Sequence, residues 1–197
     1  MAKEIKLYNT LSKEKEVFKP IDQEEIKVYS CGPTVYHYAH IGNLRAYVFA
    51  EILNNTLREA GYNVKHQINI TDVGHLVSDS DEGEDKMEKG SAREGKSVWD
   101  VAEFYTQAFY SDLKDLNIDK EKFVWTKATG YIKEQIDMIK TLEEKGYTYT
   151  TSDGVYFNTI KFMDYAELGR LDLEGLQKGK RVEDEKSEKK NKTDFAL

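Results

Sequence analysis

The sequence contains little cysteine, little proline and no long apolar run. Its one cysteine, Cys31, excludes an intrachain disulfide and any zinc knot built from two or four cysteines. The opening residues, MAKEIKLYN, lack the apolar stretch of a secretory leader, and no later run reaches the length of a membrane span. These absences predict a cytoplasmic protein with no membrane partner.

Positive charge is scarce as well. The 29 Lys and Arg residues are outnumbered by 36 Asp and Glu residues, which gives a formal net charge of -7 at pH 7. General nucleic-acid binders usually present a basic surface, so we expect no DNA partner, although a local basic patch is compatible with this charge. The 13 Tyr and 8 Phe residues argue against disorder, and 197 residues suffice for one large or two small domains.

The first third of the chain has the pattern of strand, helix, strand. Residues 26–30 predict a short β-strand that ends in the turn residues 31–34. A helix is predicted from near Gly42 to a C-terminal cap at Gly61, and residues 64–70 alternate like a second strand. The helix is predicted from apolar residues at helical spacing: Leu44, Val48, Ile52 and Leu57. This order and length suit a parallel βαβ crossover.

Two more helices and a hairpin are predicted further along. Ser97 and Asp100 resemble a capping box at the start of a long helix, and a second helix is predicted over 129–145. Asp-Gly at 153–154 predicts a hairpin turn, and the charged residues 177–192 predict a solvated loop. The face of the long helix would be formed by Val98, Val101, Ala102, Tyr105, Phe109, Leu113 and Leu116.

The segment from residue 31 to residue 43 carries the chemistry. It joins the first predicted strand to a helix N-terminus, where α/β folds bind phosphates because free N–H groups and the helix dipole favour anions. His40 and Asn43 can donate hydrogen bonds to phosphate oxygens, and Gly42 lets a ligand approach the backbone. A lone histidine is usually an ordinary loop residue, but this position and spacing favour a phosphate-binding loop.

Several motifs in order along the chain resemble those of class I cysteine–tRNA ligases. The motifs are VYSCGPTVY at 28–36, HIGN at 40–43, NITDV at 69–73 and DFAL at 194–197. Shorter agreements stand at 7–11, 127–129 and 145–147. The resemblance covers essentially the whole chain, and several motifs in order are far more specific than any one of them.

The resemblance implies an α/β fold: a class I aminoacyl-tRNA synthetase Rossmann-like half-domain with an α+β connective insertion. Residues 1–118 would be the N-terminal half of the catalytic domain, and residues 119–197 the insertion up to its return. The implied reaction activates cysteine with ATP and transfers it to tRNA-Cys. The implied partners are therefore cysteine, ATP with Mg²⁺ as substrate, and the acceptor end of tRNA-Cys.

The same resemblance implies roles for individual residues. His40, Gly42 and Asn43 occupy the ATP-binding "HIGH" motif, in which His40 and Asn43 would be catalytic and Asn43 replaces the final His. Cys31 occupies the position of a ligand to Zn²⁺, which would bind the thiolate of substrate cysteine and so reject serine without editing. The residues implied to line the amino-acid pocket are Gly32, Thr34 and Thr71.

Parts of the family pattern are missing from these 197 residues. The resemblance implies three further zinc ligands (Cys, His and Glu), a mobile "KMSKS" loop and an anticodon-binding domain, none of which is found here. Residues 189–193 only superficially resemble that lysine loop, and the acidic run 79–85 lacks the spacing of an EF-hand. We therefore expect an N-terminal fragment that does not aminoacylate tRNA alone.

Three alternatives stay open at this point. A small nucleotidylyltransferase would need a second histidine where Asn43 stands, and leaves Cys31 unexplained. A mycothiol-type ligase, which joins cysteine to an amino sugar, would share the same front half. A truncated paralogue would serve as a nucleotide-binding or interaction module without enzymatic activity.

Overall fold

The computed structural model describes residues 3–74, 91–93, 95–170 and 188–197. The chain forms two compact units, and each is described by itself. Unit 1 comprises Met1–Ile5, Val17–Asp79 and Gly83–Tyr131, and unit 2 comprises Lys6–Glu16, Ser80–Glu82 and Ile132–Leu197. No helix within the described ranges is long and apolar enough to cross a membrane.

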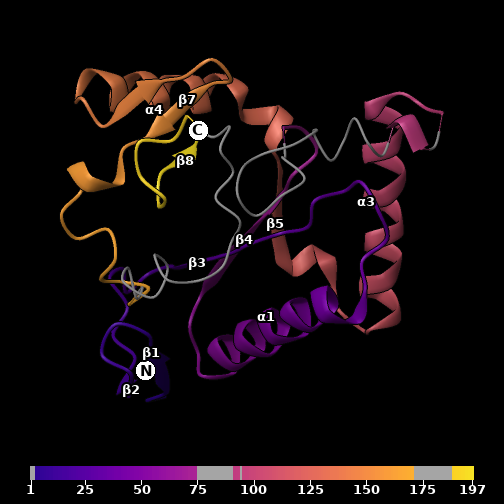
Figure 1. Ribbon diagram of the computed structural model, residues 1–197. Coiled ribbons are helices and arrows are strands. Elements are labelled where there is room, and N and C mark those ends of the chain that lie inside the picture. Colours follow the sequence, from indigo (N-terminus) through magenta and orange to yellow (C-terminus); the bar gives the residue numbers. More distant parts are fainter. Residues whose placement is uncertain (1–2, 75–90, 94, 171–187) are drawn as a thin grey trace. The chain divides into compact units, whose positions relative to one another are not determined.

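Unit 1 is built on a parallel three-stranded sheet (Figure 1). Its strands β3 (Ile26–Ser30), β4 (Val64–Ile70) and β5 (Phe123–Lys127) lie in that order, with Ile26 opposite Val64 and His66 opposite Phe123. Helix α1 (Ile41–Glu59) connects β3 to β4, and helix α3 (Val98–Asp115) lies between β4 and β5 in the chain. The predicted parallel βαβ crossover is confirmed, with both of its strands at the predicted residues.

One face of β4 forms the centre of the core. Alternate residues of this strand are buried, whereas Lys65 and Gln67 between them are exposed. Both helices pack on the buried face, since residues of α1 and α3 share a cluster with Ile68. The buried residues of that cluster are Tyr47, Ala50, Ile68, Phe109, Leu113, Ile118 and Phe123. The predicted face of α3 is therefore largely confirmed, although Leu116 at its end is 42% exposed.

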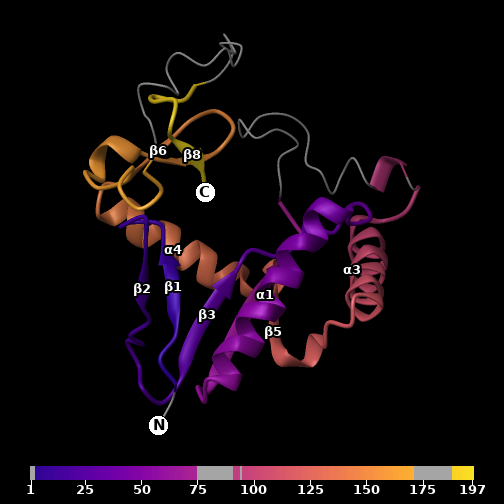
Figure 2. The ribbon, with the colours of Figure 1, turned by 90° about the horizontal axis from the view of Figure 1, so that it is seen from below.

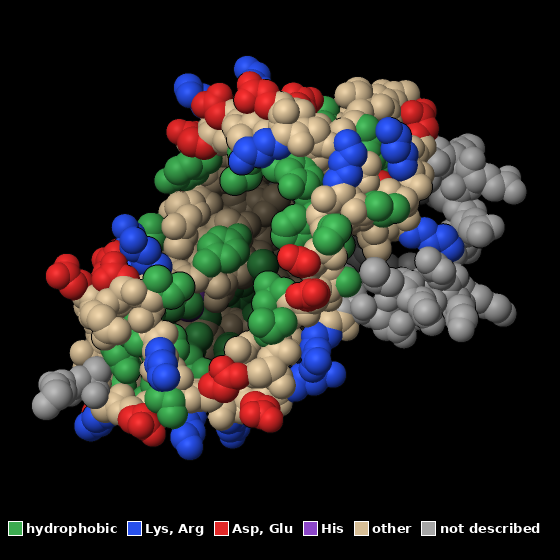
Figure 3. Space-filling model, turned by 90° about the vertical axis from the view of Figure 1, so that its left-hand side faces the viewer, with side chains coloured by type: hydrophobic (Ala, Val, Ile, Leu, Met, Phe, Trp, Pro, Cys, Tyr) green, Lys and Arg blue, Asp and Glu red, His purple; other side chains and the backbone are tan. Residues whose placement is uncertain are grey.

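Of the four apolar residues from which α1 was predicted, Leu57 is buried and Leu44 packs on the core. Val48 and Ile52 are exposed, at 36% and 58%, while Glu51 and Asn54 are buried. Apolar residues occur on more than one side of this helix, so their spacing alone does not identify the buried side. Large hydrophobic side chains also lie open on the face of the molecule shown in Figure 3.

Strand β5 was not expected from the sequence. It lies inside the segment expected to be the insertion, yet it pairs with β4 along its whole length. The compact units consequently divide after Tyr131 and not at residue 118. The assignment of 1–118 to a catalytic half and 119–197 to an insertion stays a prediction.

Unit 2 contains a helix and a small antiparallel sheet. Helix α4 (Ile132–Glu144) is followed by β6 (Thr148–Thr150), β7 (Val155–Phe157) and β8 (Phe195–Ala196), which pair in that order. The predicted hairpin around Asp153-Gly154 is thus confirmed. Strands β1 (Lys6–Asn9) and β2 (Glu14–Val17) form a separate two-stranded sheet, visible side by side in Figure 2. Short 3₁₀ turns are η1 (Lys120–Lys122), η2 (Ala128–Tyr131) and η3 (Thr159–Lys161).

The end of the charged segment 177–192 is more ordered than the sequence suggests. Residues 171–187 lie outside the described residues, but Glu188 accepts hydrogen bonds from the backbone and hydroxyl of Ser152. The backbone N–H of Lys190 donates to the hydroxyl of Tyr149 at 2.9 Å. This part of the segment is a loop whose residues Glu188, Lys190 and Lys192 are exposed, as expected, and it is also hydrogen-bonded to the β6–β7 hairpin.

Candidate functional site

Helix α1 begins at a cap formed by His40. Its Nδ1 accepts a hydrogen bond from the backbone N–H of Gly42 at 3.0 Å, and the side-chain oxygen of Asn43 accepts one from the N–H of His40 at 3.1 Å. This reciprocal arrangement is a capping box. The residues singled out from the sequence as phosphate ligands therefore also fix the start of the helix.

The cap leaves specific donors free. Because Nδ1 of His40 accepts a hydrogen bond, the proton of the neutral ring is on Nε2, which can donate to a ligand. In the described part of the chain, no acceptor is bound to the N–H of Ile41 or to the side-chain amide nitrogen of Asn43. All three groups belong to the first turn of α1, where the helix dipole favours an anion.

Gly42 lies in close contact with the capping ring. A Cβ added at this position would lie 2.7 Å from Cε1 of His40 and 3.0 Å from its Nδ1. The expectation was that Gly42 lets a ligand approach the backbone, but the space beside it is occupied by the imidazole ring. Any larger residue would push the ring away from the helix terminus.

The carboxyl ends of β3 and β4 bring the other predicted site residues together. The regular pairing of these strands ends with Ser30 opposite Ile68, and it resumes with a bridge between Thr34 and Thr71. The chain advances four residues from Ser30 to Thr34 but only three from Ile68 to Thr71. One extra residue is accommodated between Ser30 and Thr34, which is the definition of a β-bulge.

Asn69 connects the two sides of this bulge. Its Oδ1 accepts hydrogen bonds from the N–H of Gly32 at 2.8 Å and from the hydroxyl of Tyr29 at 2.9 Å. Its Nδ2 donates to Oγ1 of Thr71 at 3.1 Å. A Cβ on Gly32 would lie 1.5 Å from the backbone oxygen of Asn69, so only glycine fits there. Asn69 was recognised in the sequence as part of a motif but was given no role.

Cys31 is a free, exposed cysteine at the start of the bulge. Burial, and then Coulombic repulsion from Cys31, raise the pKa of Tyr47 on α1. A zinc site needs two or three further donors. Among the described residues, no three His, Cys, Asp or Glu side chains are grouped so that they could hold a metal ion. The described residues therefore form no complete zinc site around Cys31, and its role as a zinc ligand stays a prediction.

Asp72 joins the ends of β4 and β5. Its carboxylate accepts hydrogen bonds from the backbone N–H of Thr129 at 3.0 Å and from the hydroxyl of Thr129 at 2.7 Å. Polar residues directly after parallel strands meet at one edge of a sheet, where ligands bind in α/β folds. This rule could have identified Asp72 from the sequence.

Of the remaining histidines, His37 and His66 contact other side chains of unit 1, and His75 lies outside the described residues. The ring of His37 stacks on Tyr105, with centroids 6.0 Å apart. His66 is fully buried, and its Nε2 lies 2.8 Å from Oγ of Ser30. His75 and the acidic run 79–85 lie outside the described residues.

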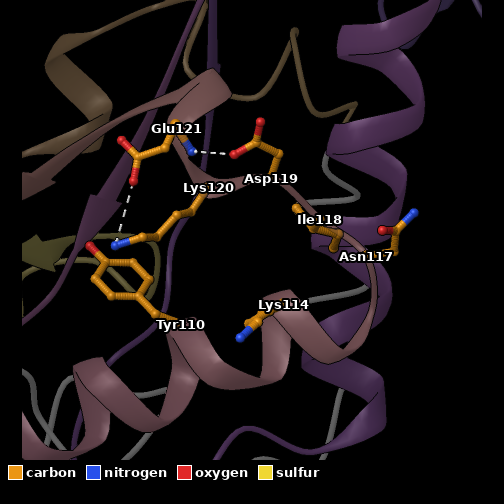
Figure 4. Close-up of a pocket in the computed structure, with 7 residues that line it drawn as sticks. All are labelled: Tyr110, Lys114, Asn117, Ile118, Asp119, Lys120 and Glu121. Carbon is orange, nitrogen blue, oxygen red and sulfur yellow. Dashed lines mark hydrogen bonds and ion pairs between the residues drawn. The ribbon is translucent and has the colours of Figure 1, made fainter.

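A pocket of about 330 Å³ lies at the C-terminal end of α3 (Figure 4). Figure 4 shows Lys120 paired with Glu121, at 3.6 Å, and the side chain of Asp119 accepting from the backbone of Glu121. The pocket contains none of the predicted site residues. It is lined by Tyr110, Lys114, Asn117, Ile118, Asp119, Lys120 and Glu121.

Comparison with known proteins identifies the family. The family model of class I (C) tRNA synthetase catalytic domains matches residues 17–197. The chain is 53% identical to cysteine–tRNA ligase 1 of Burkholderia lata over 97% of its own length and 40% of that protein. It is 51% identical to the cysteine–tRNA ligase of Treponema denticola (98% of this chain, 39% of the relative) and 50% identical to that of Zymomonas mobilis (96% and 36%). The chain thus spans about two fifths of the length of these relatives. It belongs to the class I (C) tRNA synthetase catalytic domain family.

Proposed function

We propose that this chain supplies the ATP-facing and amino-acid-facing front part of a cysteine–tRNA ligase. The observation that carries the proposal is the cap of α1, where His40 Nε2–H, Ile41 N–H and the Asn43 amide lie at one helix terminus with no acceptor among the residues that the structure describes. Relatives named cysteine–tRNA ligase at 50–53% identity support the choice of substrate. The enzyme would work in the cytoplasm.

The proposed reaction has two steps. An oxygen of the cysteine carboxylate attacks the α-phosphorus of ATP, the bond to the β-phosphate breaks, and pyrophosphate leaves with Mg²⁺. A ribose hydroxyl at the acceptor end of tRNA-Cys then attacks the carbonyl carbon of the adenylate, and AMP leaves. His40 and Asn43 would stabilise the negative charge that grows on the α-phosphate, and the α1 dipole acts in the same direction.

The amino acid would bind at the bulge between β3 and β4. Gly32 and Thr34 would form one wall and Thr71 the other, since the bridge between Thr34 and Thr71 holds these segments together. Cys31 would provide one thiolate to a zinc ion, and the other ligands would have to come from outside the described residues, which contain no suitable group of three. When bound, that ion would select cysteine by ligating its thiolate.

The test is amino-acid-dependent exchange of pyrophosphate into ATP by the complete protein. We expect exchange with cysteine and none with serine, followed by transfer of cysteine to tRNA-Cys. Transfer to an amino sugar in place of tRNA would favour the mycothiol-type ligase. Nucleotide binding without any exchange would favour the truncated paralogue.

A further inference from the structure

The amide of Asn69 is placed where a strand would ordinarily offer a backbone acceptor. At the bulge, the N–H of Gly32 donates to the Asn69 side chain, whereas the flanking backbone bonds run from Thr71 to Pro33 at 2.9 Å and from Val35 to Thr71 at 3.1 Å. The Asn69 side chain thus supplies the acceptor that a backbone carbonyl of β4 would supply in a regular sheet. Bulges next to active sites commonly re-aim a side chain, and here the residue that precedes Gly32 is Cys31.

The orientation of this amide is determined by its partners. A backbone N–H can only donate, so the atom facing Gly32 is the oxygen and the atom facing Thr71 is the nitrogen. Oγ1 of Thr71 therefore accepts from Asn69. The hydroxyl proton of Thr71 has no acceptor among the described residues and is directed away from Asn69.

We propose that Asn69 is a positioning residue of the amino-acid site. Its Oδ1 holds the Cys31–Gly32 bulge in shape, and its Nδ2 turns the Thr71 hydroxyl outward as a hydrogen-bond donor to the bound amino acid. The inference rests on the proposed function. Asn69 itself would not touch the substrate; it would act by positioning Gly32 and Thr71. A shift of about 1 Å in such groups is enough to slow a reaction by about 100-fold.

The chain offers a graded set of variants for the test. Asn69→Ala removes all three hydrogen bonds. Asn69→Asp keeps an oxygen for Gly32 and Tyr29 but cannot donate to Thr71, whose hydroxyl would then turn inward to donate to the new carboxylate. Tyr29→Phe is the matched control, since it removes one bond to the same Oδ1 and touches neither Gly32 nor Thr71.

The main experiment is pyrophosphate exchange by the complete protein, with KM measured separately for cysteine and ATP. We expect Asn69→Ala and Asn69→Asp to raise KM for cysteine about tenfold and to change KM for ATP less than about twofold. Tyr29→Phe should leave both values within about twofold of wild type. In a Thr71→Val background, Asn69→Asp should do little further harm. Additive losses, or loss of folded protein with unchanged KM values, would overturn the proposal.

A second measurement does not depend on activity. Hydrogen exchange followed by NMR at the amide signal of Gly32 reports the hydrogen bond from this N–H to Asn69. Asn69→Ala should accelerate exchange of this amide about tenfold or more, while Asn69→Asp and Tyr29→Phe should retain its protection. Absence of cysteine-dependent pyrophosphate exchange in the wild type would reject the proposed function, but it would not reject the role of Asn69 in holding the bulge. Unchanged protection in Asn69→Ala would reject the role of Asn69.

Discussion

Nδ1 of His40 and the backbone N–H of Gly42 are joined by a hydrogen bond of 3.0 Å. One nitrogen of the imidazole therefore caps helix α1, and the other is left to donate to a ligand. Under the proposed function the same residue has a structural and a chemical task, and the two can be separated by substitution.

Replacing His40 by Ala and by Asn separates these tasks. His40→Ala should lower the free energy of unfolding by about 1 kcal/mol, because the cap is lost. It should also slow pyrophosphate exchange about 100-fold, because a donor to the α-phosphate is lost. Asn is a good capping residue but cannot present a donor where Nε2 lies, so His40→Asn should recover stability and not rate. Recovery of both by Asn would show that His40 acts only as a cap.

Gly42→Ala tests the close contact with the imidazole. Alanine ordinarily stabilises a helix by about 1 kcal/mol relative to glycine. Here the new methyl group would displace the His40 ring, so we expect no net gain in unfolding free energy and about tenfold slower exchange. Gly130→Ala is the control, because no atom lies within 4 Å of its added Cβ. Equal activity of Gly42→Ala and Gly130→Ala would contradict this account.

His66 should make unit 1 less stable in mild acid. Burial, with the positive charge of Arg58, holds the pKa of His66 below its ordinary value of 6.5, against the opposing effect of Glu51. The folded state thus favours the neutral ring, and its stabilisation is complete above pH 6.5 and is lost as the pH falls from there through the folded-state pKa. NMR titration of the ring resonances, assigned with His66→Gln, measures this pKa. A midpoint at or above 6.5 would refute the prediction.

Asp194 should stabilise unit 2 through its charge. Burial would raise its pKa, but hydrogen bonds from Thr159, Tyr149 and Asn191 outweigh burial and hold the pKa below the ordinary 3.8. Its contribution is present above that value and is lost as the pH falls through the folded-state pKa. Asp194→Asn should cost about 2 kcal/mol in urea unfolding at pH 7. The exposed Asp164→Asn serves as control, and equal stability of the two variants would contradict the prediction.

The sequence predicted the elements of unit 1 whose evidence is local. Strand β4 alternates cleanly between buried and exposed residues, and the start of α1 is marked by His40 and Asn43 within one turn. The signals that failed are non-local. Strand β5 is only five residues long and is defined by pairing with β4, more than fifty positions earlier in the chain. The buried side of α1, with Glu51 and Asn54, depends on which neighbours cover it.

The site residues stay a prediction, and the connections between them were not predicted at all. Cys31, Gly32 and Thr71 were selected by resemblance, which assigns positions and not contacts. The bulge depends on a comparison of two segments nearly forty residues apart, Ser30 with Ile68 and Thr34 with Thr71. Asn69 could be given a role only once that comparison was possible, because its partners are remote in the chain.

The bulge also limits how the length of this segment can change. The extra residue between Ser30 and Thr34 is what separates the Gly32 N–H from the regular pairing and places it opposite the Asn69 side chain. Deleting one residue here would make the pairing with β4 regular, with Thr34 still opposite Thr71, and would remove the bulge that Asn69 holds. Insertions and deletions between Ser30 and Thr34 should therefore be less well tolerated than substitutions, so the length of this segment should be constrained more strongly than its side chains.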